Sequence, residues 1–212
     1  MIDAAASLHS RGFDVFPIRR PYKRVLGAYF AKKNGKYPAS ILGLCGAYFG
    51  WKTDVRAFVN RPDANIGVLT GRRHNLVIID VDFPDGGKSS MKKLNLPETL
   101  TAVTGSGLHL YYRHPGGKVP TCAGRLAPGI DVKGERSFAT APPSLHYSGF
   151  RYRWLDEGAG ISELPSATVD ALRHLPHRSL VRDLIYILAL VNVLLPISAA
   201  LGILFQSSKQ RA

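Results

Sequence analysis

The chain has 212 residues, and its 28 lysines and arginines outnumber its 15 aspartates and glutamates, which gives a formal net charge of +13. This length suits one α/β domain with a substantial core, and the positive excess favours a polyanionic partner or an anionic membrane surface. Cys45 and Cys122 lie far apart and form no Cys-x-x-Cys pair, so neither a disulfide framework nor a zinc cluster is indicated. Residues 1–6 lack the long apolar run of a secretory signal, and we therefore expect a cytoplasmic protein.

The N-terminal part of the chain predicts a short helix, a strand and a basic loop. The pattern favours a helix over residues 3–12, which ends at Gly12, and a β-strand over residues 13–18. The loop at 19–38 mixes basic and aromatic side chains, which can hold phosphates and stack on bases, although an ordinary solvated loop is the alternative. Its candidate nucleic-acid contacts are Arg19, Arg20, Lys23, Arg24, Lys32, Lys33 and Lys36.

A predicted helix at 53–60 precedes two predicted strands, at 64–71 and 76–82, and the second of them ends in Asp80-Val81-Asp82. Residues i and i+2 of a strand share a face, so Asp80 and Asp82 point the same way. Two neighbouring carboxylates repel each other unless one has a raised pKa or a divalent cation binds between them. The pair therefore favours a metal site, with two solvated aspartates at the start of a turn as the alternative. A short helix at 87–95 is expected after it.

A glycine-rich turn and the strand after it, residues 104–113, form a second informative block. Backbone amides in such a turn can approach an anion closely, and alternation along the strand places His109 and Arg113 on one face. Histidine and arginine beside a glycine turn suit a triphosphate, although a lone strand histidine is more often an ordinary polar residue. The candidate nucleotide-binding residues are Gly105, Ser106, Gly107, His109 and Arg113, with Lys133 further along the chain.

Residues 129–134 supply a further carboxylate, Asp131, which shares a strand face with Lys133. Taken alone, Asp131 is typical of a surface residue. Two-metal phosphoryl-transfer sites need several oxygen ligands to hold two cations, so Asp131 becomes informative as a third carboxylate beside Asp80 and Asp82.

Taken in order, these blocks resemble the bifunctional primase–polymerase (Prim-Pol) domain of the archaeo-eukaryotic primase superfamily over about residues 3–175. The matching motifs are Val15-Phe16-Pro17, Lys36-Tyr37-Pro38, Ala64-Asn65-Ile66-Gly67-Val68 with Thr70-Gly71, Asp80-Val81-Asp82, the block from Thr104 to Arg113, Gly129-Ile130-Asp131, Ala141-Pro142-Pro143-Ser144 and His146-x-x-Gly149-x-x-Tyr152-x-Trp154. The resemblance implies an α/β (α+β) catalytic core of two lobes, one with an RRM-like sheet. It also implies that Asp80, Asp82 and Asp131 are the catalytic metal carboxylates, and that Ser106 and His109 contact the phosphates of the incoming nucleotide.

The chain departs from the family's pattern after the third carboxylate. The family tends to carry a small, glycine-rich stretch there, whereas this chain reads Gly134-Glu135-Arg136-Ser137-Phe138. Lys133 stands where arginine is common, and Phe58 stands where a tryptophan often precedes the Asn-Ile-Gly strand. The first difference bears on nucleotide fit and sugar preference, and that at Phe58 only on packing.

The functional hypothesis is template-directed nucleotidyl transfer by a DNA primase and DNA polymerase that replicates a plasmid, phage or prophage-like element. Two Mg²⁺ or Mn²⁺ ions on the three carboxylates would activate a 3′-hydroxyl and neutralise the leaving pyrophosphate. The expected partners are a single-stranded DNA template, NTP or dNTP substrates and a separate helicase. Two alternatives stay open: a catalytically inactive nucleic-acid-binding replication module of the same fold, and a metal-dependent nuclease that uses the same carboxylates.

The composition changes after Pro176, so the predicted catalytic domain covers 1–176 and a hydrophobic tail covers 177–212. Residues 184–205 are almost wholly apolar and long enough for a bilayer-spanning helix, which needs about 20 residues. Arginines precede this stretch, at Arg173, Arg178 and Arg182, which favours a cytoplasmic catalytic domain tethered to the membrane. The alternatives are a packed or self-associating helix and a remnant of a longer protein.

Overall fold

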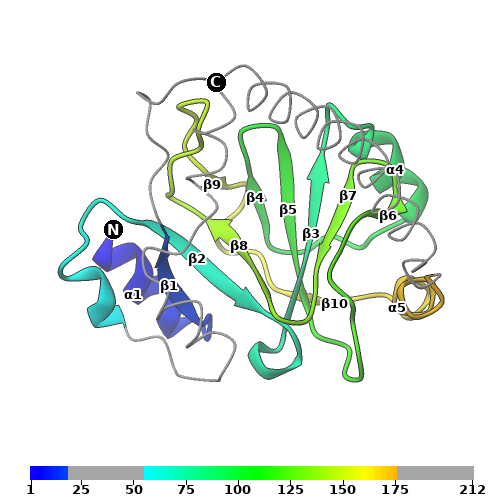
Figure 1. Ribbon diagram of the computed structural model, residues 1–212, viewed down its shortest axis with the longest axis horizontal. Coiled ribbons are helices and arrows are strands. Elements are labelled where there is room, and N and C mark those ends of the chain that lie inside the picture. Colours follow the sequence, from blue (N-terminus) through cyan, green and yellow to red (C-terminus); the bar gives the residue numbers. More distant parts are fainter. Residues whose placement is uncertain (19–54, 176–212) are drawn as a thin grey trace, which may run out of the picture. The chain divides into compact units, whose positions relative to one another are not determined.

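The computed structural model describes residues 1–18 and 55–175 (Figure 1). The chain divides into two compact units, Met1–His174 and Leu175–Ala212, and the fold described below is that of the first. No helix in this described part is long and apolar enough to cross a membrane. The predicted basic loop at 19–38, the domain boundary after residue 176 and the apolar stretch 184–205 lie wholly or largely outside the described residues and stay predictions.

The described part is a mixed α+β fold dominated by sheets, with few helices. In chain order its elements are α1 (Ile2–Ser10), β1 (Val15–Ile18), the 3₁₀ helix η1 (Val55–Phe58), β2 (Asn65–Thr70), the 3₁₀ helix η2 (Arg72–His74), β3 (Leu76–Asp82), α4 (Gly87–Leu94), β4 (Thr101–Val103), β5 (Gly107–Arg113), β6 (Cys122–Ala127), β7 (Ile130–Lys133), β8 (Ser137–Ala141), β9 (Arg153–Trp154), β10 (Ser162–Glu163) and α5 (Ser166–Arg173). The strands and helices expected from the sequence are present with small shifts of their ends. The exception is the helix predicted at 53–60, whose described part is a single 3₁₀ turn, because only Phe58 of this turn is buried and no apolar face extends it.

The described strands form a small sheet, in the order β1-β2-β8, and a large sheet of seven strands. All pairs in the small sheet are antiparallel. Pro17 lies on β1, an edge strand of the described sheet, where the missing backbone donor is tolerated. Gly67 on the neighbouring strand leaves room for the Phe16 ring, since a Cβ there would lie 2.7 Å from two of the ring's carbons.

The large sheet has the order β6-β7-β3-β5-β4-β9, and β10 pairs in parallel with β5. Strand β3 lies between β5 and β7 and is antiparallel to both (Figure 1). Its apolar residues are completely or almost completely buried, as expected for a central strand covered on both faces. This position brings the residues at the end of β3 between two partner strands.

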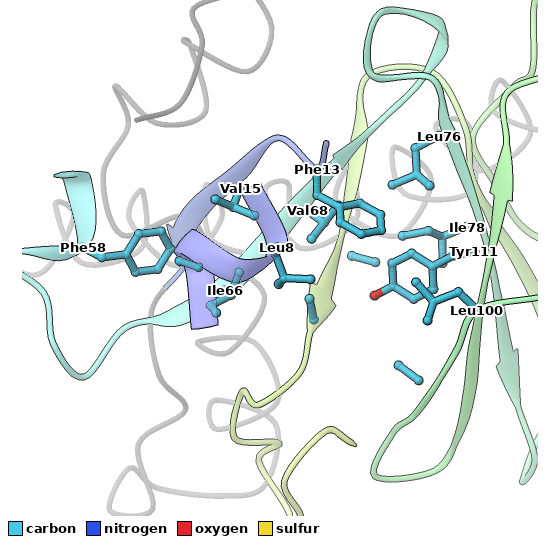
Figure 2. Close-up of a cluster of buried hydrophobic side chains, with 14 of the residues drawn as sticks. Leu8, Phe13, Val15, Phe58, Ile66, Val68, Leu76, Ile78, Leu100 and Tyr111 are labelled. Atoms are coloured by element: carbon cyan, nitrogen blue, oxygen red, sulfur yellow. The ribbon is translucent and has the colours of Figure 1, made fainter. Parts of the chain in front are cut away.

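The hydrophobic core joins the two sheets with helix α1 (Figure 2). Burial of these side chains is the main force that holds the small sheet against one face of the large sheet, at about 25 cal/mol per Å² of apolar surface. The labelled members of this cluster are Leu8, Phe13, Val15, Phe58, Ile66, Val68, Leu76, Ile78, Leu100 and Tyr111. Ile78 and Tyr111 come from β3 and β5, so the face of the large sheet that meets the small sheet is the one that also carries Asp80 and His109.

Candidate active site

The three predicted blocks meet on one face of the large sheet. Asp80 of β3 is the direct cross-strand partner of His109 on β5 and of Asp131 on β7. Directly paired residues in antiparallel strands have their Cβ atoms about 5 Å apart. The structure therefore brings together Asp80, His109 and Asp131, which are widely separated along the chain.

Lys133 lies between two of the carboxylates. Its Nζ is 3.3 Å from Asp80 Oδ2 and 3.0 Å from Asp131 Oδ2. The other Asp131 oxygen, Oδ1, accepts a hydrogen bond from the Gly124 amide at 3.0 Å. The ammonium group thus offsets the repulsion that two cross-strand carboxylates would otherwise feel.

The charges of this cluster change the acidity of its members. Burial by itself would raise the pKa of Asp80, but His109 and Lys133 outweigh burial and hold the pKa of that carboxyl well below its usual range. For Lys133, burial favours the neutral amine, yet Asp80 and Asp131 raise the pKa of the ammonium above its ordinary value. Both groups are therefore charged near neutral pH.

The orientation of His109 is fixed by the small sheet. Its Nδ1 lies 3.1 Å from the Thr140 carbonyl oxygen, which can only accept, so Nδ1 carries the proton and donates. Nε2 then faces Asp80 Oδ1 at 3.4 Å. The Tyr152 ring lies beside the imidazole, at 5.7 Å between ring centres. Nε2 is thus the ring atom on the side of the candidate site, where it faces Asp80.

Asp82 lies two residues beyond Asp80 on β3 and pairs with Gly107 on β5. Its backbone amide donates to the Gly129 carbonyl at 2.8 Å, whereas its side-chain Oδ1 is buried without a hydrogen-bond partner in the described structure. A buried carboxylate oxygen without a partner is costly unless a cation or donor binds it. Asp82 is therefore suited to a cation, which residues 1–18 and 55–175 do not themselves supply.

The predicted metal carboxylates fit a divalent cation by their chemistry, because hard carboxylate oxygens are the ligands that Mg²⁺ and Mn²⁺ prefer. Within residues 1–18 and 55–175, however, no three histidine, cysteine, aspartate or glutamate side chains converge closely enough to hold a metal ion. Lys133 Nζ bridges Asp80 and Asp131 instead. A cation that used both carboxylates would have to replace this ammonium group.

The predicted phosphate-binding turn is tightly packed. A Cβ on Gly107 would lie 1.8 Å from the Val81 carbonyl oxygen, and one on Gly105 would lie 2.0 Å from Nδ1 of His146. The Ser106 amide donates to Thr104 Oγ1 at 3.2 Å, so this amide is already used within the turn. Close packing against the backbone thus requires glycine at position 107, whatever the turn binds, whereas a side chain at 105 would have to displace the His146 ring.

Arg113 is not brought to the cluster. It lies four residues beyond His109 on β5, about 13 Å along the strand, and pairs with Leu76. Its Nε donates to the Ile161 carbonyl and lies 3.6 Å from Glu163 Oε1. The structure therefore places Arg113 at the other end of the strand from the carboxylates.

Three residues around the site were not selected from the sequence: Thr140, His146 and Tyr152. Thr140 contributes its backbone carbonyl, and a contact made by the backbone cannot be predicted from the type of residue. The rings of His146 and Tyr152 meet edge-on with their centres 5.9 Å apart, and Tyr152 also lies beside His109. Their signal was present in the His-x-x-Gly-x-x-Tyr-x-Trp motif, but the motif alone does not give a direction for either side chain.

Carboxylates paired across strands with a histidine, on a sheet-dominated α+β fold, are consistent with a phosphoryl-transfer site. Residues 5–167 match the family described as bifunctional DNA primase/polymerase, N-terminal (Prim-Pol). The match covers most of the chain, and the chain belongs to this family. The resemblance inferred from the ordered motifs is thereby confirmed. No match was found among curated proteins.

Membership in this family implies primase/polymerase chemistry, that is, nucleotidyl transfer with a DNA template and nucleotide substrates.

Proposed function

We propose that this chain synthesises primers or extends them by template-directed nucleotidyl transfer at the cluster of Asp80, His109 and Asp131. The observation that carries the proposal is the register of the large sheet, in which Asp80 pairs with both of the other residues. An acidic pair can hold the cations that neutralise a polyphosphate, and a basic chain suits a nucleic-acid template.

Asp80, Asp82 and Asp131 would hold two Mg²⁺ or Mn²⁺ ions. When bound, such ions activate an attacking hydroxyl and neutralise the charge of a leaving pyrophosphate. The unpartnered Oδ1 of Asp82 supports this assignment, because it needs a positive partner.

The other residues of the cluster would act on the triphosphate. The Thr140 carbonyl holds His109 so that Nε2 can donate to a phosphate oxygen when the ring is protonated. Lys133 can exchange its carboxylate partners for phosphate oxygens, since its flexible stem carries a single rotatable ammonium group. The amides of Gly105 and Gly107 remain candidates for the phosphates, with Ser106 contributing its side chain.

The finer architecture also belongs to this proposal. The small sheet with α1 would be one lobe of the catalytic core, and the large sheet would be the RRM-like lobe. Replication of a plasmid, phage or prophage-like element, a separate helicase, and a membrane tether through 184–205 rest on the sequence alone.

The test is a primer-extension and de novo priming assay on single-stranded DNA, with each nucleotide set and with Mg²⁺ or Mn²⁺. Wild type should incorporate nucleotides, and Asp80→Asn and Asp82→Asn should lose incorporation while they keep template binding. Asp170→Asn is a matched control, because this exposed carboxylate lies on another element, α5, and pairs there with Arg173.

Two results would replace the proposal. Template binding by wild type without incorporation under any condition would identify an inactive replication module. Metal-dependent shortening of the oligonucleotide would identify a nuclease.

A further inference from the structure

A pocket of about 180 Å³ lies where β2 ends and β8 begins. The residues that matter here are Phe16, Leu69 and Phe138, which are apolar, and Arg73 and Arg136, which are basic. None of them belongs to the cluster around Asp80 or to the binding residues predicted from the sequence, although Arg136 and Phe138 lie in the stretch that departs from the family's glycine-rich pattern.

One wall of the pocket is aromatic. Phe138 is half-buried, and the buried Phe16 supports it edge-on, with ring centres 5.2 Å apart and planes at 82°. Leu69 completes this apolar cluster. A dry cavity of about 150 Å³ holds one benzene-sized molecule, so this pocket has the volume for one planar ring system that stacks on Phe138.

The rim of the pocket is positively charged. Arg73 comes from η2 and Arg136 from the turn between β7 and β8, and both side chains are exposed. Neither forms an ion pair with a carboxylate of the described residues. The carboxylate of Glu135 also lines the pocket, but its Oε1 accepts from His114 Nε2 at 3.0 Å and from the Arg72 amide at 3.3 Å.

The backbone at Arg136 is strained. Its φ of 53° lies in the left-handed region, which favours glycine and costs a side-chain-bearing residue about 1–2 kcal/mol. Arg136 lies in the stretch 134–138, where this chain departs from the family's glycine-rich pattern. A non-glycine residue kept at such an angle on the rim of a pocket is consistent with a role for its side chain.

The pocket is next to the candidate active site along β8. Phe138 and Thr140 share a face of this strand, two residues and about 6.6 Å apart. The Thr140 carbonyl accepts from His109, and its side chain interacts with the Tyr152 hydroxyl. A polymer that reached the carboxylates along β8 would therefore pass the pocket.

We propose that this pocket binds one unpaired base of a single-stranded nucleic acid, which stacks on Phe138 while the adjoining phosphates contact Arg73 and Arg136. A strand carries a phosphate on each side of every base, and the two arginines come from two separate loops. A free nucleotide carries its phosphates on one side only, and the residues proposed for a triphosphate lie at His109. The inference rests on the proposed function only in the choice of nucleic acid as the partner.

The test measures binding of the full chain to a fluorescent DNA strand of about 15 nucleotides, without divalent cation or free nucleotide. Phe138→Leu should weaken binding by about 5- to 150-fold, because base–aromatic stacking is lost, whereas Phe138→Tyr should bind like wild type. On a strand of the same length made only of abasic units, wild type and Phe138→Leu should bind equally. This last comparison isolates the contact with the base from any general effect of the substitution.

Arg136→Gly should lower the slope of log affinity against log salt by about 0.7, the value for one phosphate contact on a single strand. Its thermal stability should equal or exceed that of wild type, since glycine adopts the observed φ without strain. Arg136→Lys should keep the salt slope. Arg61→Gln, which removes a charge at an exposed site outside the pocket, is the matched control.

Equal strand binding by wild type, Phe138→Leu and Arg136→Gly would overturn the proposal. Weaker binding of ATP or dATP by these variants, with strand binding intact, would assign the pocket to a free nucleotide and overturn it as well. The assay needs no incorporation, so a chain that bound strands in this way but never extended a primer would contradict the catalytic proposal alone.

Discussion

Replacing Lys133 by methionine tests the electrostatic account of the site. The substitution removes the ammonium group that lies 3.3 Å from Asp80 Oδ2 and 3.0 Å from Asp131 Oδ2, and it keeps most of the side-chain volume. Loss of one partner from a fully buried ion pair costs about 3–5 kcal/mol, whereas an exposed pair contributes about 0–1 kcal/mol. The Lys133 side chain is 21% exposed and that of Asp131 37%, so we expect an intermediate loss of about 2 kcal/mol.

Urea and thermal unfolding of wild type and Lys133→Met measure this loss, which corresponds to a fall of about 4–8 °C in Tm for a domain of this size. Lys133→Arg is the control that retains the charge. Mn²⁺ should then stabilise Lys133→Met more than wild type, because the ion no longer competes with an ammonium group for the same carboxylates. A ligand at a hundredfold excess over its Kd adds about 2.7 kcal/mol.

Equal stability of Lys133→Met and wild type would refute the balance of charges described here. A variant that is destabilised but gains nothing more from Mn²⁺ than wild type would refute the use of Asp80 and Asp131 as cation ligands.

Three further substitutions test the framework of the site. Gly107→Ala should destabilise the fold by more than about 3 kcal/mol in urea unfolding, because its Cβ would lie 1.8 Å from the Val81 carbonyl oxygen. An unfolding midpoint near that of wild type would contradict this packing. Ser144→Ala should lower the free energy of unfolding by about 1–3 kcal/mol, because the buried Ile66 amide loses its acceptor, Ser144 Oγ at 2.8 Å. An unchanged free energy of unfolding would exclude that hydrogen bond. Burial lowers the pKa of His114 below its ordinary 6.5, so the unfolded chain takes up this proton at a higher pH than the folded chain. Stability should therefore fall as the pH falls through about 6.5. The pH dependence of Tm should be shallower in His114→Gln, and parallel profiles would show that this histidine does not contribute.

The positions of the functional residues along their strands could be predicted from the sequence, and their partners could not. Period-two alternation places Asp80 and Asp82 on one face of β3, and the same rule places Asp131 and Lys133 together on β7. That Asp131 lies opposite Asp80 depends on the register of β3 with β7, which is set by distant parts of the chain. Resemblance of the ordered motifs to the family predicted that the three carboxylates lie together, whereas the alternation of residues along each strand did not.

The prediction that Arg113 binds the nucleotide meets a geometric difficulty. Alternation correctly places it on the face of His109, but a shared face does not bring residues together when they lie four positions apart on an extended strand. The glycine turn gives a second example. The sequence indicates a phosphate cradle there, while the structure shows that strand packing against Val81 already requires a glycine at position 107.

Lys133 links these observations to the chemistry. The sequence predicts that Lys133 binds the nucleotide, and the structure gives it a second role, because its Nζ lies on Asp80 and Asp131. These roles are compatible if the ammonium group leaves the carboxylates when cations and a triphosphate bind together. The cations then neutralise the carboxylates in place of the ammonium group, which is free to contact the triphosphate. The unpartnered Oδ1 of Asp82 has no such substitute among the described residues. On this argument Asp82 is the carboxylate at which a cation should bind first, and Asp82→Asn should therefore weaken Mn²⁺ binding more than Asp131→Asn in a direct titration.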